Sequence, residues 1–286
     1  LSLDSDYELV SDLDCSNTSS WNNGKGFDPV GNSTVGYEFS GKFYGRDHLV
    51  NDFEIKRSST DNVGIFSLLG PGGLVKNVSF IDADVQGNDN VGVVAGDVSR
   101  RQNQKTISHV LVDGRVKGNN IVGMIVGSFD IKTTVKNSYS TGSVYSDRLA
   151  GGITARKAGD IVDSYSHADV ISYNQNAISG GILARSNTGL INRTYSIGQH
   201  NFSQSNGGIL DEDNGGTFEN SYWDINKSQQ QGSAAGTGLY SSQIRNNGSL
   251  NGFDYSSTWA VGDKNGGYPY LQELPVIPYI YDLELE

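Results

Sequence analysis

Cysteine, methionine and proline are all scarce in this chain of 286 residues, which has one Cys, one Met and five Pro. The single cysteine, Cys15, excludes a disulfide framework and a cysteine-based metal site, so the fold must hold without covalent cross-links. The four histidines stand apart from one another, and the His-Glu-x-x-His pattern of zinc proteases does not occur. A Gly-x-Ser-x-Gly elbow, a phosphate loop and a dinucleotide fingerprint are missing as well. These absences predict a protein that is not an enzyme and needs neither cofactor nor metal.

Positive charge is sparse too. The chain has 21 Lys and Arg against 32 Asp and Glu, a net charge of −11, and no basic run longer than Arg100-Arg101. Nucleic acid is therefore a poor partner. No apolar stretch approaches the roughly 20 residues that a spanning helix requires, which predicts no membrane insertion. The chain opens on Leu1 without a basic and apolar leader, which fits either a processed mature protein or part of a longer one.

Glycine, in contrast, is abundant, with 37 residues, while 36% of the chain is hydrophobic and 10% is aromatic. High glycine with little proline indicates many turns in a regular chain, because the apolar fraction is still large enough to fill an interior. We therefore expect a folded protein that is rich in β-strands.

A short phrase with a glycine in second position recurs six times. The phrases are Val63-Gly64-Ile65-Phe66, Val91-Gly92-Val93-Val94, Val122-Gly123-Met124-Ile125, Gly151-Gly152-Ile153-Thr154, Gly180-Gly181-Ile182-Leu183 and Gly207-Gly208-Ile209-Leu210. The second-position glycines are separated by 28, 31, 29, 29 and 27 residues. A fixed period of this length is the signature of a repeat architecture.

A second column of apolar residues runs at the same period, followed in most repeats by a step of the Asn-Ser-Tyr type. Its members are Val75, Ile107, Val135, Ile161, Ile191 and Phe218. The segments are four to seven residues long, rich in β-branched and aromatic types, and separated by Gly, Asn and Asp clusters, which indicates strands. Such units bury their apolar side chains only by stacking on one another.

These patterns predict an all-β fold, a parallel β-helix or β-solenoid of about six coils, with a stack length on the order of 30 Å at ~4.8 Å per coil. We expect an N-terminal strand and capping segment in residues 1–60, the repeats in 61–223, and a C-terminal cap with a terminal strand arm in 224–286. The recurring glycine would mark a corner that needs a positive φ or a close approach of two backbones. One short helix is expected, near Ser241–Arg245.

The phrase Gly-Gly-Ile/Leu followed by Asn-Ser-Tyr-Ser-Thr-Gly resembles the GLUG motif, most closely at Val135-Lys-Asn-Ser-Tyr-Ser-Thr-Gly142. GLUG-motif repeats occur in bacterial and archaeal surface or adhesin-like proteins and in the non-catalytic repeat region of IgA-type metalloproteases. The resemblance covers residues 61–223, and it implies an extracellular repeat protein without the proteases' catalytic part. At Ser108-His109-Val110 and Asn192-Arg193-Thr194 the chain departs from the motif, which opens the ladder to interruption there.

Both termini alternate apolar and polar residues with the period of a half-buried strand. The apolar positions are Leu1, Leu3, Tyr7 and Leu9 at one end, and Tyr279, Tyr281, Leu283 and Leu285 at the other. Either these tails pair within the subunit, or each adds a strand to a neighbouring copy. In the second case head-to-tail exchange would produce an open filament.

Carboxylates and cations could also converge on one face, as in carbohydrate-processing β-helices. The candidates, at polar steps of consecutive coils, are Asp82, Asp84, Asp113, Arg115 and Lys117. Charged corners are, however, what any solvated solenoid presents. The Asp-x-Asp pairs of the chain lack the other ligands of a calcium loop.

Seven Asn-x-Ser/Thr sequons permit N-glycosylation, which is little more than chance gives in so Asn-rich and Ser-rich a chain. They are Asn17, Asn32, Asn77, Asn192, Asn201, Asn226 and Asn247. A recurring tyrosine could form a stacked ladder that either fills the interior or offers an aromatic surface to a sugar. Its members are Tyr139, Tyr165, Tyr195 and Tyr222.

The sequence therefore favours a non-enzymatic structural or adhesive protein, extracellular or at the cell surface, that assembles into a fibre through its terminal strands. Its expected partners are copies of itself and surface glycans. The alternatives are a β-helix that processes or binds polysaccharide, and a binding module of a larger surface protein.

Overall fold

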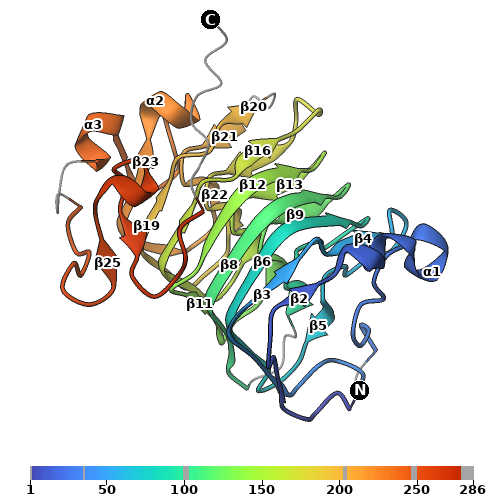
Figure 1. The fold of residues 1–286 in the computed structure, drawn as a ribbon. Coiled ribbons are helices and arrows are strands. Elements are labelled where there is room, and N and C mark those ends of the chain that lie inside the picture. Colours follow the sequence, from blue (N-terminus) through green and yellow to red (C-terminus); the bar gives the residue numbers. More distant parts are fainter. Residues whose placement is uncertain (1, 35, 99–102, 202–204, 246–249, 278–286) are drawn as a thin grey trace, which may run out of the picture.

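The structure is a computed structural model that describes residues 2–34, 36–98, 103–201, 205–245 and 250–277. It is an all-β stack of about six coils in which each strand lies beside its copy one coil away (Figure 1). Every pairing within the stack is parallel. The predicted parallel β-solenoid is confirmed.

Three sheets form the faces of the stack. Sheet A has the strands β1 (Tyr7–Glu8), β2 (Leu13–Asp14), β3 (Lys42–Asn51), β4 (Glu54–Lys56), β6 (Leu74–Gln86), β8 (Lys105–Lys117), β11 (Thr133–Lys136), β12 (Tyr139–Tyr145), β15 (Asp160–Ser166), β16 (Asp169–Ile171), β19 (Leu190–Ser196), β20 (His200–Asn201), β23 (Thr217–Asp224) and β24 (Thr237–Leu239). Sheet B has β5 (Phe66–Leu69), β7 (Ala95–Val98), β10 (Val126–Phe129), β14 (Thr154–Lys157), β18 (Leu183–Ser186) and β22 (Leu210–Asp213). Sheet C has β9 (Ile121–Gly123), β13 (Leu149–Gly151), β17 (Ile178–Gly180) and β21 (Ser205–Gly207).

The remaining elements are short and lie outside the stack or at its ends. They are η1 (Ser16–Ser20), α1 (Trp21–Gly24), α2 (Ile225–Ser228), α3 (Ser241–Ile244), η2 (Asp263–Asn265) and the antiparallel pair β25 (Trp259–Ala260) and β26 (Tyr270–Leu271). The expected helix near Ser241 is present as α3.

The second predicted column is aligned through all six coils, from Val75 to Phe218. Two residues further on, each coil has a residue in the left-handed region, with φ between 45° and 57°. These residues are Asn77, His109, Asn137, Asp163, Arg193 and Asn220. The ladder continues through His109 and Arg193, so the expected interruptions are not observed. Left-handed backbone costs a non-glycine residue about 1–2 kcal/mol, and Asn and Asp, which occupy four of these six positions, adopt it most readily.

The residues of the Asn-Ser-Tyr step have separate roles at this corner. The left-handed residue turns the strand, so the next N–H loses its place in the backbone ladder. A hydroxyl from the following coil accepts it instead: Val110 N donates to Ser138 Oγ at 3.1 Å and Ser138 N to Ser164 Oγ at 3.2 Å. The tyrosine that follows then points out of the stack. The motif is thus explained by backbone hydrogen bonding rather than by chemistry of a site.

The glycine column has a different register from the one expected. The aligned glycines are Gly64, Gly92, Gly123, Gly151, Gly180 and Gly207, one residue earlier than predicted in the last three coils. None of them has a positive φ. A Cβ at Gly123 would collide with the carbonyl oxygen of Val126 and with Thr154 in the next coil, so close approach of backbones is the reason for glycine.

Inward side chains fill the stack with columns of like residues. One column consists of Ile55, Val85, Val116, Val144 and Val170, all at most 1% exposed, and ends at His200. Stacked β-branched side chains of equal size leave few voids, which suits a core that repeats every coil.

The N-terminal segment closes one end of the stack, although coil pairing already begins at β3, inside the predicted cap. The strands β1 and β2 pair in parallel with β3. Three surface ion pairs follow the same seam: Asp6–Lys42 at 3.0 Å, Glu8–Arg46 at 2.7 Å and Asp12–His48 at 3.0 Å. Tyr7 and Leu9 thus belong to their own subunit, whereas Leu3 lies in a turn. Leu1 and residues 279–285 of the other predicted arm lie outside the described residues.

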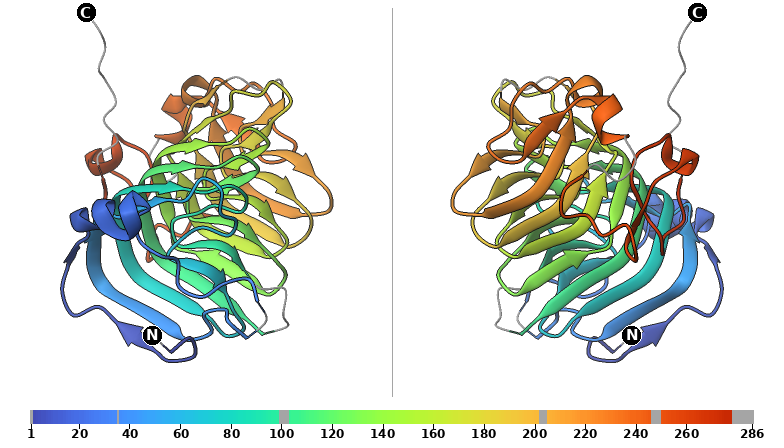
Figure 2. Two further views of the ribbon diagram at one scale, coloured as in Figure 1. Left: turned by 90° about the vertical axis from the view of Figure 1, so that its right-hand side faces the viewer. Right: turned by 90° about the vertical axis from the view of Figure 1, so that its left-hand side faces the viewer.

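The opposite end is covered by residues 225–239. Gly208 N donates to the carbonyl oxygen of Gly232 at 3.0 Å, and Ala234 N to that of Leu210 at 2.8 Å, so the open edges of sheets B and C are paired. Residues 250–277, here named the flank segment, then run back along the outside of sheet A (Figure 2). The C-terminal region is therefore a cover for the side of the stack as well as a cap.

Candidate functional site

The tyrosine ladder exists, but it lies on the outside of sheet A. The rings of Tyr139 and Tyr165 stack with centroids 4.5 Å apart at 4°, and those of Tyr165 and Tyr195 at 4.9 Å and 6°. All three tyrosines are at most 2% exposed, because Trp259 and other apolar residues of the flank segment cover them. The ladder neither fills the interior of the coils nor offers a surface to a sugar; it holds the flank segment.

Hydroxyl groups of the ladder fix the backbone that covers them. Tyr139 Oη donates to the carbonyl oxygen of Pro275 at 2.6 Å and accepts the N–H of Ile277 at 3.0 Å. Tyr195 Oη donates to the carbonyl oxygen of Pro269 at 2.5 Å. Burial raises the pKa of Tyr139 above its ordinary value. The Tyr139 hydroxyl therefore stays neutral and both donates and accepts a hydrogen bond.

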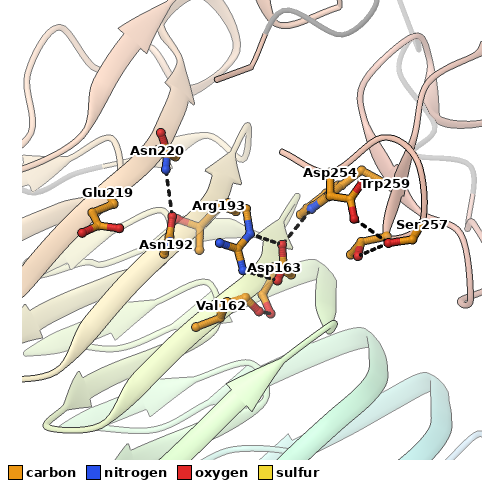
Figure 3. Close-up of polar contacts among 12 residues, drawn as sticks. Val162, Asp163, Asn192, Arg193, Glu219, Asn220, Asp254, Ser257 and Trp259 are labelled. Carbon is orange, nitrogen blue, oxygen red and sulfur yellow. Dashed lines mark hydrogen bonds and ion pairs between the residues drawn. The ribbon is translucent and has the colours of Figure 1, made fainter. Parts of the chain in front are cut away.

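Arg193 and Asp163 form the polar seam beside the ladder (Figure 3). The guanidinium of Arg193 donates to both carboxylate oxygens of Asp163, at 2.6 and 2.7 Å, and Trp259 Nε1 donates to the same carboxylate at 3.1 Å. The hydrogen bond to Asp163 raises the pKa of Arg193. Nearby, Asn220 Nδ2 donates to Asn192 Oδ1 at 3.1 Å. Two of the left-handed corner residues that depart from Asn, Asp163 and Arg193, therefore form a bidentate ion pair that anchors the flank segment.

A serine, a histidine and a glutamate meet at the other end of this seam, around a cavity of about 210 Å³. His109 Nε2 lies 2.8 Å from Glu273 Oε2, and burial lowers the pKa of His109. Ser257 lines the same cavity, but its hydroxyl donates to Asp254. Two serine hydroxyls lower the pKa of Asp254 to about 2. With the serine turned away from the histidine, the group lacks the nucleophile–base contact of acyl transfer.

The predicted carboxylate and cation candidates do come together, on the part of sheet A that the flank segment leaves open. The strand register places them in two outward columns. One is Glu54, Asp84, Arg115, Ser143 and Asp169; the other is Lys56, Gln86, Lys117, Tyr145, Ile171 and Asn201. We call these two columns the open face.

Contacts on the open face link its charges to one another and to aromatic rings. Lys56 forms an ion pair with Asp84. The guanidinium of Arg115 lies over the ring of Tyr145, 5.2 Å from its centroid, and Tyr145 stacks on Tyr173 at 6.4 Å and 21°. Tyr173 is 71% exposed. An exposed ring flanked by charged and polar groups is the kind of surface on which a sugar ring can stack.

Asp113 and Asp82 lie at the edge of the open face. Burial, and then the neighbouring charge of Asp82, raise the pKa of Asp113. A shallow cavity of about 200 Å³ beside them is lined by Asp52, Glu54 and Asp84 among others. In the part of the chain that the structure describes, no group of three or more His, Cys, Asp or Glu is placed to hold a metal ion.

The sequons differ in accessibility. Asn17, Asn32 and Asn226 are exposed, and Asn201 is partly exposed at the end of the open face. Asn77 has its side-chain oxygen buried, and Asn192 is 8% exposed, so a glycan does not fit on Asn192 in the folded chain. Asn247 lies outside the described residues.

Sequence reasoning missed the aromatic pair of Tyr145 and Tyr173. The position of Tyr145 was predictable. It lies six residues after the ladder tyrosine Tyr139 in the same strand, and residues an even number apart in a strand point to the same face. Tyr173 lies in a loop, whose path no periodicity reveals.

No model of a known protein family matches the chain. Halomucin from Haloquadratum walsbyi (strain DSM 16790 / HBSQ001) is 34% identical to it over 135 residues, which are 46% of this chain and 1% of Halomucin. The chain thus spans about one hundredth of the length of this relative. A solved structure of a candidate immunoglobulin A1 protease from Bacteroides ovatus superposes with a TM-score of 0.72 at 20% identity, covering 94% of this chain and 86% of that one. At that identity the likeness extends to the fold alone. Among the described residues, no helix is long and apolar enough to cross a membrane.

Proposed function

We propose that this chain is a non-enzymatic β-solenoid of an extracellular or cell-surface protein, with a structural or adhesive role. The observation that carries the proposal is that the clustered polar side chains make structural contacts. The convergent sets, at Asp163–Arg193 and at His109–Glu273, join the flank segment to the stack, and the serine that shares a cavity with His109 is hydrogen-bonded to Asp254 instead. Similarity to Halomucin over part of the chain supports the surface location.

The finer proposal is assembly into a fibre through the C-terminal arm. Because the N-terminal strand pairs within its subunit, the proposal assigns the exchanged strand to residues 278–286, whose sequence alternates apolar and polar residues. At the N-terminal end of the stack lies an apolar groove of about 260 Å³, lined by Tyr7, Glu8, Leu9, Phe27, Val30, Phe39, Phe43, Ile65 and Phe66. Its proposed occupant is the arm of a second copy, with its alternating Tyr279, Tyr281, Leu283 and Leu285.

The dimensions and symmetry of such a contact favour a filament. Nine extended residues reach roughly 30 Å, enough to lie along the first coil of a neighbour. The two contacting surfaces differ, so each added copy leaves one groove and one arm free, and the assembly stays open.

Light scattering and electron microscopy of the full chain test this proposal. We expect a mass that grows with concentration and filaments in the images. A chain that ends at Ile277, and the variant Phe27→Asp in the groove, should both remain monomeric, while the exchange Asp282→Asn should not prevent assembly. A full chain that stays monomeric at every concentration refutes the fibre, though not the surface solenoid.

A second candidate function is polysaccharide binding at the open face, favoured by the stack of Arg115, Tyr145 and Tyr173. Binding of neutral and acidic oligosaccharides by Tyr173→Ala and the unchanged chain tests it, with Tyr240→Ala, also exposed, as the matched control. Loss of binding in the first variant alone supports this candidate. The non-enzymatic role is tested by the same ligands, because any shortening of the oligosaccharides by the pure chain contradicts it.

A further inference from the structure

A groove of about 340 Å³ lies on the outside of sheet B, on a different face from the tyrosine ladder and the open face. Its lining includes Ser128 on β10, Arg156 on β14, and Asn187 and Thr188 in the loop after β18, together with Asp97 and Asp130 at its rim. This volume is in the range of small-ligand sites. The lining mixes a cation, hydroxyls, an amide and carboxylates with the apolar side chain of Ile131.

Arg156 is the distinctive group of the groove. Strand register aligns Asp97, Ser128, Arg156, Arg185 and Glu212 in one outward column of sheet B. Arg185 is neutralised by Glu212, with 2.6 Å between Nη2 and Oε2. Among the described residues, Arg156 makes only long contacts, at 3.3 and 3.4 Å, to the hydroxyl of Ser128. Arg156 is thus the cation in the groove lining that remains for an anion, within a chain whose net charge is −11.

One wall of the groove is held rigid from inside the stack. Lys157 is fully buried, and its Nζ donates to the carbonyl oxygen of Thr188 at 2.8 Å and to that of Gly159 at 2.9 Å. The hydroxyl of Thr188 in turn donates to the carbonyl oxygen of Ala158 at 2.8 Å, so its oxygen can still accept a hydrogen bond. The loop that supplies Asn187 and Thr188 is thus fixed before any ligand arrives, which reduces the entropy lost on binding.

We propose that this groove binds an acidic saccharide, with the carboxylate of one uronate unit on Arg156. Two N–H groups of a guanidinium match the two oxygens of a carboxylate, and a neutral sugar offers no such partner. The hydroxyls of the ring find donors and acceptors in Ser128, Asn187 and Thr188.

Calorimetric titration of the full chain with trigalacturonate, near neutral pH, tests the proposal. The methyl ester of the same trisaccharide is the control ligand, since it keeps the rings and removes the charge. We expect the acid to bind and the ester to bind at least about tenfold more weakly, which is what loss of a charge-assisted hydrogen bond produces. R156Q should weaken binding of the acid by a similar factor, and R148Q, which removes the same charge from an exposed residue outside the groove lining, should leave it unchanged.

The results for the variants distinguish binding in the groove from binding on the open face. Loss of affinity in R156Q alone, with an unchanged circular dichroism spectrum, supports the groove, and a similar loss in N187A strengthens it. Absence of binding at millimolar trigalacturonate overturns the proposal, as does equal affinity for the ester. Binding that survives R156Q but fails in R115Q also overturns it and places the ligand on the open face instead. None of these outcomes bears on fibre formation, which depends on the terminal arm.

Discussion

Two buried histidines predict that this fold loses stability steeply in weak acid. His167 is 2% exposed, with Nε2 3.0 Å from the hydroxyl of Tyr195. His200 is 5% exposed at the end of the inward valine column, and neither of its ring nitrogens has a hydrogen-bond partner among the described residues. Burial lowers the pKa of His167 to about 3 and that of His200 to about 4, from 6.5.

The sign of the effect follows from proton binding. Between pH 6.5 and the folded pKa values, the unfolded chain binds two protons that the folded chain does not, so the free energy of unfolding falls as pH falls. At about pH 4.5, each histidine costs about 2–3 kcal/mol relative to neutral pH, and both together about 5 kcal/mol. A domain is stable by only about 5–15 kcal/mol, so the pair can bring the fold close to its unfolding midpoint.

Denaturant unfolding at about pH 7.5 and 4.5, followed by far-ultraviolet circular dichroism, measures this loss. The variant H200V isolates one contribution, because Val occupies the same inward position in the coil before it, at Val170. We expect the loss between the two pH values to shrink by about 2–3 kcal/mol in H200V. The surface histidine His48 provides the control: H48Q should change the loss by less than about 1 kcal/mol.

The comparison of variants removes the contribution of carboxylates, which titrate in the same range in every form of the chain. An H200V variant that loses as much stability in acid as the unchanged chain would refute the reasoning, since the charge on His200 would then be accommodated without cost. A variant destabilised equally at both pH values would show instead that the imidazole matters only for packing.

Three further perturbations test other parts of the fold. Trp259→Ala should cost about 3–5 kcal/mol and expose residues 250–277 to proteolysis while the strand signal in circular dichroism remains; equal protection of the two proteins would contradict the role of the ladder. Gly180→Ala should cost about 1–3 kcal/mol in thermal unfolding, because a Cβ there meets backbone atoms, whereas Gly232→Ala, with open space around it, should stay within about 0.5 kcal/mol. Burial lowers the pKa of Lys157 to about 8, so stability should rise by about 2 kcal/mol between about pH 7 and 9.5, and a Lys157→Met chain should lack this rise.

The sequence predicted the repeat and the fold because both follow from periodicity. Identical units must bury identical apolar columns, so the spacing of Val75, Ile107 and their successors already contains the strand register. The glycine column was predicted one residue late in the last three coils. Val-Gly and Gly-Gly phrases both place a glycine second, and only backbone pairing distinguishes Gly151 from Gly152.

The flank segment, in contrast, was not predictable from the pattern. Its docking joins Trp259 to Asp163, 96 residues apart, and the segment has no period that would reveal its partner. The same limit applied to the candidate charges. The repeat period placed Asp84 and Arg115 at corresponding steps of consecutive coils. Whether Tyr173 lies beside them depends on the path of a loop, which the period does not reveal.

The flank segment also changes how the coils share their stability. In a bare solenoid each coil contacts only its two neighbours, so the array can unzip from either end, one layer after another. Here a single strip of chain touches the outer side chains of successive coils from Leu111 to Tyr195 and is tied to them by the ring stack and the Arg193 seam. We therefore expect those coils to unfold as one cooperative unit, while the coils nearest the N-terminus unfold separately. A pulling force applied at the N-terminal end should then extend the chain in small steps before one large unfolding event.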